Sequence, residues 1–160
     1  MPAEKLTYEE FLSGAESKDQ TFIQTLHAEL LEKGCKGSYE KKKTSLLASY
    51  KLGKPPKALL NLLIKKQGLF VRIYGENAWN YQDFLQTIPG EMVQSIAKGG
   101  DCGRLIKNTC SMKCSGYDVT IGNQRFQKCR YSGFEFLVTE ESGGSIKAFV
   151  EHELEKRTAP

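Results

Sequence analysis

"ALLNLLIKKQGLFVRIYG", residues 58–75, holds two apolar runs joined through the dipeptide Gln67-Gly68. Two such runs separated by a short turn containing glycine are typical of a β-hairpin. In the second run, Leu69, Val71 and Ile73 alternate with larger or charged residues, so they face one side of a strand. The stretch therefore predicts an antiparallel strand pair, and the rest of the chain is interpreted around it.

Further strands are expected on both sides of this hairpin. Residues 44–53 have the composition of a strand and are followed by the connector "KPP". A second hairpin is expected within residues 117–131, where Gly122-Asn123 separates "YDVTI" from "QRFQKCRY". Residues 133–138, "GFEFLV", continue the sheet. The strands are joined by short turns, which favours antiparallel pairing.

Helices are expected before, between and after the strands. Apolar residues recur at helical spacing over residues 17–33, with Ser17 or Asp19 as the N-cap and Gly34 at the C-terminal end. The other helices are expected at residues 7–12 with Thr7 as N-cap, at 78–88, from Pro89-Gly90 to Lys98, and at 143–157 with Ser145 as N-cap.

The order of these elements predicts an α+β fold. We expect an antiparallel sheet of about five to six strands with helices packed on it, including helices at the N- and C-terminal ends. At 160 residues the chain is long enough to form one domain with its own core. Within a single domain 1–160, residues 1–38 would form an N-terminal helical element. Residues 39–160 would form the α+β body, including a cysteine-rich segment at 99–130.

Composition and the N-terminal residues predict a cytoplasmic protein. The hydrophobic fraction of 39% and charged fraction of 26% are those of an ordinary soluble globular chain. The first residues are acidic and contain no apolar run, so they resemble neither a signal peptide nor a transit peptide, and no apolar stretch is long enough to cross a membrane. In the cytoplasm thiols stay mostly reduced, which argues against a disulfide framework.

The cysteines form the strongest candidate site. Four of the five lie within 28 residues, namely Cys102, Cys110, Cys114 and Cys129. Four thiolates are a standard ligand set for structural zinc, and a spacing of four residues would put two of these cysteines on one side of a helical turn. The chain has no C-x2-C knuckle, so two other readings stay open. The thiols would be inert, or Cys110 and Cys114 would act as a redox pair. Cys35 stands apart as an isolated thiol.

A lysine-rich region suggests a face for an anionic partner. Nine lysines and a single acidic residue, Glu40, lie between residues 36 and 66. The candidate face comprises Lys41, Lys42, Lys43, Lys51 and Lys54. Nucleic-acid binding through Lys41, Lys42 and Lys43 is one alternative. The net charge of +4 does not favour it over an ordinary solvated surface.

No catalytic motif is present, which favours a protein that is not an enzyme. Nucleophile elbows, zinc-protease helices, P-loops and dinucleotide fingerprints are all absent from the sequence. His27 and His152 each stand alone on an expected helix. Tyr74, Trp79 and Tyr81 either line a ligand pocket or form the hydrophobic seam between sheet and helix.

Three segments resemble a group of short uncharacterised bacterial proteins, mostly from Firmicutes: "NLLIKKQGLFVRIYG", "FLQTIPGEM" and "KCRYSGFEFLV". The resemblance covers roughly residues 40–155 and implies a bacterial cytoplasmic α+β protein, with no functional residues to transfer. The sequence as a whole predicts a non-enzymatic domain in which the cysteine cluster holds structural zinc and the fold binds a small ligand or a protein partner.

Overall fold

The computed structural model describes residues 4–106 and 116–158, and the chain divides into two compact units, residues 1–72 and 73–160. Each unit is described by itself below. The division falls at the end of strand β5 and not at residue 38, where the sequence suggested a boundary between helical element and α+β body. In the described part of the chain, every helix is too short or too polar to cross a lipid bilayer.

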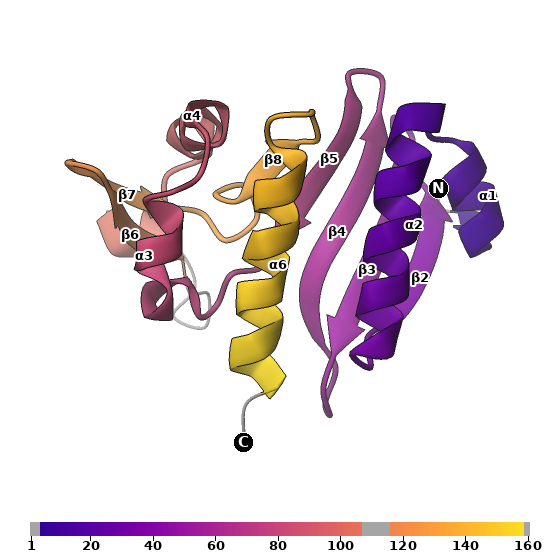
Figure 1. Ribbon diagram of the computed structural model, residues 1–160, viewed down its shortest axis with the longest axis horizontal. Coiled ribbons are helices and arrows are strands. Elements are labelled where there is room, and N and C mark those ends of the chain that lie inside the picture. The colour runs from indigo at the N-terminus through magenta and orange to yellow at the C-terminus, as the bar shows by residue number, and fades with distance from the viewer. Residues whose placement is uncertain (1–3, 107–115, 159–160) are drawn as a thin grey trace. The chain divides into compact units, whose positions relative to one another are not determined.

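The first unit is an antiparallel sheet with two helices (Figure 1). Its strands lie in the order β1-β2-β3-β4-β5, and Figure 1 shows α2 running across one face of them. The elements are β1 (Glu4–Leu6), α1 (Tyr8–Ser13), α2 (Ser17–Glu32), β2 (Lys36–Lys41), β3 (Leu46–Leu52), β4 (Lys57–Lys65) and β5 (Gly68–Ile73).

The hairpin expected at residues 58–75 is present as β4 and β5. The turn between them is two residues long, and Gly68 follows it at φ +137°, a conformation that side chains other than glycine's rarely adopt. Leu69, Val71 and Ile73 are buried, as their alternation predicts. Burial of this set holds the register, because a shift by one residue would turn all three toward solvent.

Two strands, β1 and β2, were not expected from the sequence. β2 has the sequence "KGSYEK", which lacks the apolar alternation of a half-buried strand and is mostly exposed. It pairs with β3 over six residues, so its backbone hydrogen bonds rather than its side chains define it as a strand. β1 in turn pairs with β2. β1 depends on a partner that is distant in the sequence, and β2 pairs with the next strand but lacks apolar alternation, so local patterning reveals neither.

The helix caps of the first unit are partly as predicted. Thr7 caps α1 in a full capping box, in which its side chain accepts from the Glu10 amide and the Glu10 carboxylate accepts from the Thr7 amide. The prediction of Ser17 or Asp19 as N-cap of α2 is wrong. Glu16 holds that position and makes no cap hydrogen bond with its side chain. Gly34 follows the helix at φ +92°, as expected for a C-terminal glycine.

The second unit contains a two-stranded sheet, a third strand and several helices. The expected hairpin at Gly122-Asn123 joins β6 to β7, and Gly122 has φ +62°. The elements after β5 are the 3-10 helix η1 (Ala78–Asn80), α3 (Gln82–Leu85), α4 (Gly90–Lys98), α5 (Gly103–Ile106), β6 (Tyr117–Ile121), β7 (Gln124–Lys128), β8 (Glu135–Leu137) and α6 (Gly143–Thr158).

The helix expected at 78–88 is two short pieces, η1 and α3. The side chains of Gln82 in α3 and of Gln86 directly after it form hydrogen bonds to the backbone of β6 in place of a neighbouring strand. Gln82 Oε1 accepts from the Thr120 amide, and Gln86 Nε2 donates to the Thr120 carbonyl. Gln86 Oε1 also accepts from the Gly122 amide at 2.7 Å. These glutamines satisfy backbone groups on an edge strand that would otherwise be open.

The C-terminal helix, α6, begins earlier than its predicted cap. It starts at Gly143, so Ser145 lies inside the first turn and is not the N-cap. The fully buried Ser142 precedes the helix, and its hydroxyl donates to the Leu137 carbonyl and accepts from the Thr139 amide. The predicted cap is wrong because Ser145 has the residue type of an N-cap but lies within the first turn, whereas the helix begins directly after Ser142.

The fold class expected from the sequence is confirmed. Both units combine antiparallel strands with helices, and helices lie near both ends of the chain. In the second unit the Ile73 amide, at the end of β5, donates to the carbonyl of Phe134 just before β8. The core of this unit is aromatic, with Tyr117, Phe134, Phe136 and Phe149 all buried.

Candidate functional site

Two of the four clustered cysteines lie on neighbouring segments of the second unit. Asp101 and Lys128 form an isolated antiparallel bridge. On either side of it, the Cys102 amide donates to the Gln127 carbonyl and the Cys129 amide donates to the Gly100 carbonyl. Side chains alternate along such a bridge, so Cys102 and Cys129 face the same side, diagonally across it. Cys102 is buried and Cys129 is half-buried, and both are free thiols.

Lys128 holds these two segments together. Its ammonium, which is largely buried, donates to the carbonyls of Ala97 and Gly99 and to the carboxylate of Asp101 at 2.8 Å. The first two carbonyls belong to the C-terminal end of α4, where a cation is favoured by the helix dipole. The backbone around Cys102 is therefore positioned independently of any bound ion.

Gly116 closes the site from the side of β6. A Cβ built on this glycine would overlap the Cys102 Sγ and lie 2.9 Å from the Lys128 carbonyl, so the backbone passes directly over the thiol. Cys110 and Cys114 lie outside the described residues. Within residues 4–106 and 116–158, no group of three or more potential metal-ligating side chains is present. Cys102 and Cys129 thus lie on adjoining segments, and the convergence of the four cysteines stays a prediction.

The predicted anionic-partner face is divided between two ends of the sheet. In the register of β2 and β3, Lys41 lies opposite Leu46 at one end, whereas Lys36 lies opposite Lys51 at the other. Five residues of strand separate these positions, about 17 Å. Lys41, Lys42 and Lys43 belong to the first end, where Lys42 pairs with Glu40 at 2.9 Å. Lys51 and Lys54 belong to the second.

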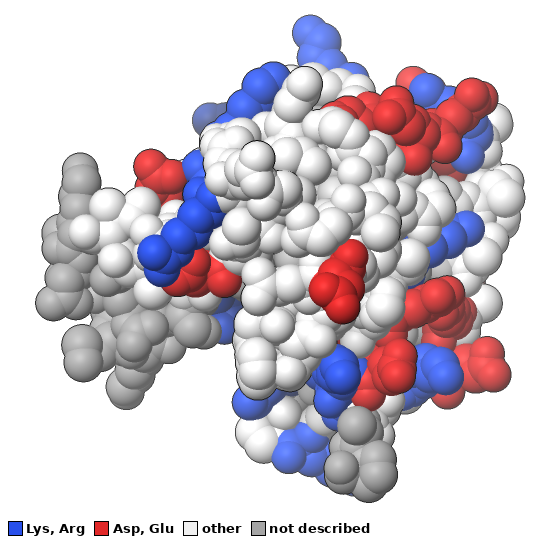
Figure 2. All heavy atoms as spheres, turned by 60° about the vertical axis from the view of Figure 1, so that its left-hand side comes forward, with Lys and Arg blue, Asp and Glu red and all other residues white. Residues whose placement is uncertain are grey.

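At the second end the lysines surround a surface hollow of about 280 Å³. We call it the lysine hollow, and its lining residues are Gly34, Lys36, Lys51, Gly53, Lys54 and Pro56. Lys36 was not among the candidates from sequence, because only the pairing of β2 with β3 brings it beside Lys51. Figure 2 shows one face of the molecule, on which basic and acidic side chains both lie among uncharged residues.

The three aromatic residues considered for a pocket have different environments. Tyr74 and Tyr81 are buried, whereas Trp79 is 65% exposed. The Tyr74 ring lies under the guanidinium of Arg130, and Tyr81 stacks on His152 with ring centroids 5.4 Å apart. Tyr74 and Tyr81 therefore pack inside the unit, as expected for residues in a hydrophobic seam between sheet and helix.

A buried carboxylate that sequence reasoning missed lies beside this seam. Glu153 is fully buried, and four donors surround it. Oε1 accepts from the Asn77 amide at 3.1 Å and the Tyr81 hydroxyl at 2.6 Å, and Oε2 accepts from Asn77 Nδ2 at 2.9 Å and Arg157 Nε at 2.7 Å. Burial, followed by the adjacent carboxylate, raises the pKa of Tyr81, so this hydroxyl stays a donor.

These contacts give Glu153 a structural role. Its two oxygens have about four acceptor positions, and all four are used, so none is left for a substrate proton. A signal for this residue was present in the sequence, since Glu153 falls on the same helical face as Phe149 and Arg157. An acidic residue on an apolar face, with an arginine one turn later, predicts a buried ion pair.

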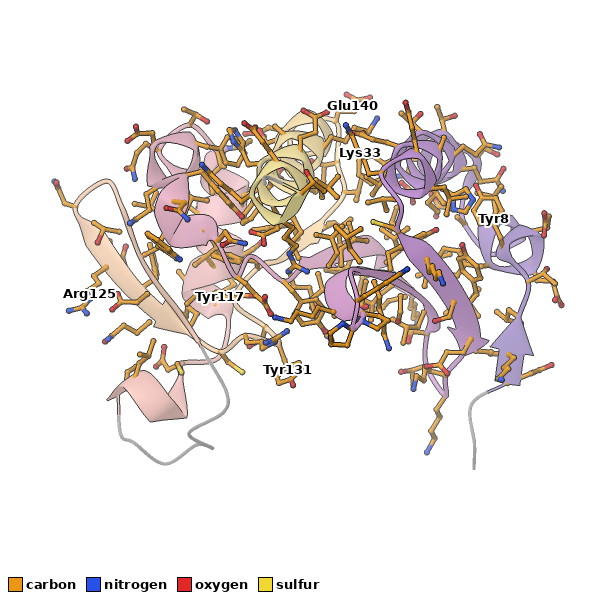
Figure 3. All side chains as sticks on the ribbon, turned by 90° about the horizontal axis from the view of Figure 1, so that it is seen from below. Tyr8, Lys33, Tyr117, Arg125, Tyr131 and Glu140 are labelled. Carbon is orange, nitrogen blue, oxygen red and sulfur yellow. The ribbon has the colours of Figure 1, made fainter. Side chains whose placement is uncertain are left out.

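Tyr117 makes a second connection within this unit. Its hydroxyl accepts from the Gly75 amide at 3.1 Å and donates to the Ile73 carbonyl at 3.2 Å, and its ring stacks on Phe134. Figure 3 shows Tyr117 directed into the unit, whereas Arg125 on the β6–β7 hairpin is directed away from it. Arg125 forms a bidentate pair with Asp118, which lowers the pKa of that carboxyl.

A polar aromatic cluster occupies the first unit around His27. The Tyr8 ring stacks on the imidazole with centroids 3.7 Å apart. His27 Nδ1 lies 2.8 Å from the hydroxyl of Tyr50, which lies 3.2 Å from the hydroxyl of Tyr39. His27 is therefore half-buried in the packing between helix and sheet.

This cluster predicts acid sensitivity. Desolvation lowers the pKa of His27, while the nearby Glu9 opposes that shift. In the unfolded chain a histidine titrates near pH 6.5. Above that pH the contribution of His27 to the free energy of unfolding is fully present, and it is lost as the pH falls toward and through the lower pKa of the folded state. We expect a loss of up to about 1.4 kcal/mol per pH unit in this window, measured by urea unfolding between pH 7.5 and 5.5. His27→Asn should flatten this part of the profile, and identical profiles for the two proteins would contradict the prediction.

Comparison with known proteins adds no relative. No protein-family model matches this chain, and neither a curated protein nor a solved structure matches it.

Proposed function

We propose that this protein is a non-enzymatic binding module whose second unit carries a structural zinc site. Its ligands would be Cys102, Cys110, Cys114 and Cys129. The single observation that carries the proposal is the backbone bridge at Asp101 and Lys128, which sets two of the four cysteines on one side of adjoining segments.

Covalent geometry supports the inclusion of Cys114. Gly116 packs directly against the Cys102 thiol, and only one residue, Ser115, separates Gly116 from Cys114 in the sequence. Two steps along the chain span at most about 7 Å. Zinc would be bound by thiolates, and its chemistry would be to cross-link the segments rather than to activate a substrate, since four protein ligands fill a tetrahedral site.

The test measures metal content in the full-length chain purified without added zinc. We expect about one equivalent of zinc by mass spectrometry, released when the thiols are titrated with an organomercurial. Single alanine substitutions at Cys102 and Cys129 should each reduce the zinc content at least fivefold. Cys35→Ala is the matched control, since Cys35 is also buried but lies in the first unit, and it should retain the metal.

Two results would contradict the proposal. One is less than about half an equivalent of zinc while four thiols remain titratable. The other is a metal-free protein that stays folded and forms a disulfide between Cys110 and Cys114 under mild peroxide, reversed by dithiothreitol. The second result would assign the segment to thiol redox chemistry instead.

A further inference from the structure

We propose that the lysine hollow of the first unit is a binding site for a compact, multiply charged phosphate anion such as pyrophosphate. The site is independent of the cysteine cluster, which lies in the other unit. Three segments line it: the connection from α2 into β2, the end of β3, and the turn between β3 and β4.

Three lysine side chains lie close together at the hollow. Lys36 and Lys51 are direct partners in the β2–β3 ladder, so their side chains leave the same face of the sheet about 5 Å apart at their Cβ atoms. Like charges directly opposite each other destabilise a strand pair. Lys54 adds a third ammonium from the turn that follows β3. An anion held between the three would remove this repulsion.

In the part of the chain that the structure describes, the lysines of the hollow have no acidic partner. No lining residue of the hollow is acidic. Among the described residues, Lys36, Lys51 and Lys54 form no ion pair with a carboxylate, in contrast to Lys18 and Lys42 in the same unit. The end of α2 contributes about half a negative charge at most, and three ammonium groups exceed it.

The shape of the hollow selects the size of the ligand. Gly34 and Gly53 both have positive φ, at +92° and +99°, so each of the two turns that border the hollow contains one position without a side chain. Its volume of about 280 Å³ is at the lower end for ligand pockets. Lysine ammonium groups bind phosphate as point charges without demanding one fixed geometry. A small phosphate anion fits these properties better than a cofactor-sized molecule.

The experiment titrates inorganic pyrophosphate into the 15N-labelled full-length protein and follows backbone amide shifts. We expect saturable shifts at residues 34–36 and 51–54. The triple variant Lys36→Gln, Lys51→Gln, Lys54→Gln should weaken binding at least tenfold. The control is the triple variant Lys41→Gln, Lys42→Gln, Lys43→Gln, which removes the same charge at the other end of β2 and should bind within twofold of the unmodified protein.

Three outcomes would overturn the proposal. They are shifts that do not saturate, shifts located elsewhere, and equal weakening in both triple variants, which would indicate a general charge effect. Single-stranded DNA serves as a second probe. Binding of DNA that depends on Lys41, Lys42 and Lys43 as strongly as on the hollow, with no pyrophosphate site, would assign the lysines to an extended polyanion instead.

Discussion

Replacing Glu153 with glutamine is expected to lower the free energy of unfolding by about 3 kcal/mol or more, because it breaks a buried ion pair and leaves Arg157 with an amide in place of a carboxylate. The glutamine would also direct its NH2 group at Asn77 Nδ2 and Arg157 Nε, two donors that now face Oε2. For a chain of this size the loss corresponds to a fall in Tm of roughly 6–12 °C. Thermal and urea unfolding followed by circular dichroism would measure it.

The control for this prediction lies on the same helix. Glu151 is exposed on α6, so Glu151→Gln changes charge and helix propensity equally without touching the network. It should stay within about 0.5 kcal/mol of the unmodified protein. If Glu153→Gln cost less than about 1 kcal/mol, the four hydrogen bonds to Glu153 would not hold α6 against residues 77–81, and the carboxylate would need another explanation.

Phe149→Ala is expected to have an effect of similar size, about 3–5 kcal/mol, through a different mechanism. Phe149 is fully buried, and its ring contacts four others at centroid distances of 5.0 to 6.0 Å, namely Tyr81, Phe84, Phe134 and Phe136. Truncation leaves a cavity at the centre of the unit, and the rigid aromatic neighbours cannot collapse into it.

Phe149→Leu is the matched variant, since it keeps most of the volume and loses the aromatic contacts. We expect it to cost about 1–2 kcal/mol, between the unmodified protein and the alanine variant. A loss below about 1.5 kcal/mol for Phe149→Ala would show that the aromatic cluster is loosely packed. The double variant with Glu153→Gln should be non-additive, because both residues pack against Tyr81.

The candidate sites differ in how far the sequence could predict them. The cysteine cluster was visible as a crowding of thiols, but no local pattern predicts the bridge between residues 101 and 128 that sets Cys102 and Cys129 on adjoining segments. The lysines were predicted as one face. Strand register decides instead that Lys51 belongs with Lys36 and not with Lys41. Glu153 was overlooked because its partners Asn77 and Tyr81 are more than 70 residues away.

Local signals in the residues were enough to predict the hairpins and most of the helices. Hairpins form where a glycine permits the turn and apolar residues alternate, and helices form where apolar residues recur at every third or fourth position. The strands β1 and β2, the start of α6 and the neighbours of each charged side chain followed only from the folded chain. β2 lacks apolar alternation although its partner β3 is the next strand, and β1 pairs with β2 across more than 30 residues. Backbone hydrogen bonds and burial against other segments set these outcomes, and neither leaves a periodic pattern in the sequence.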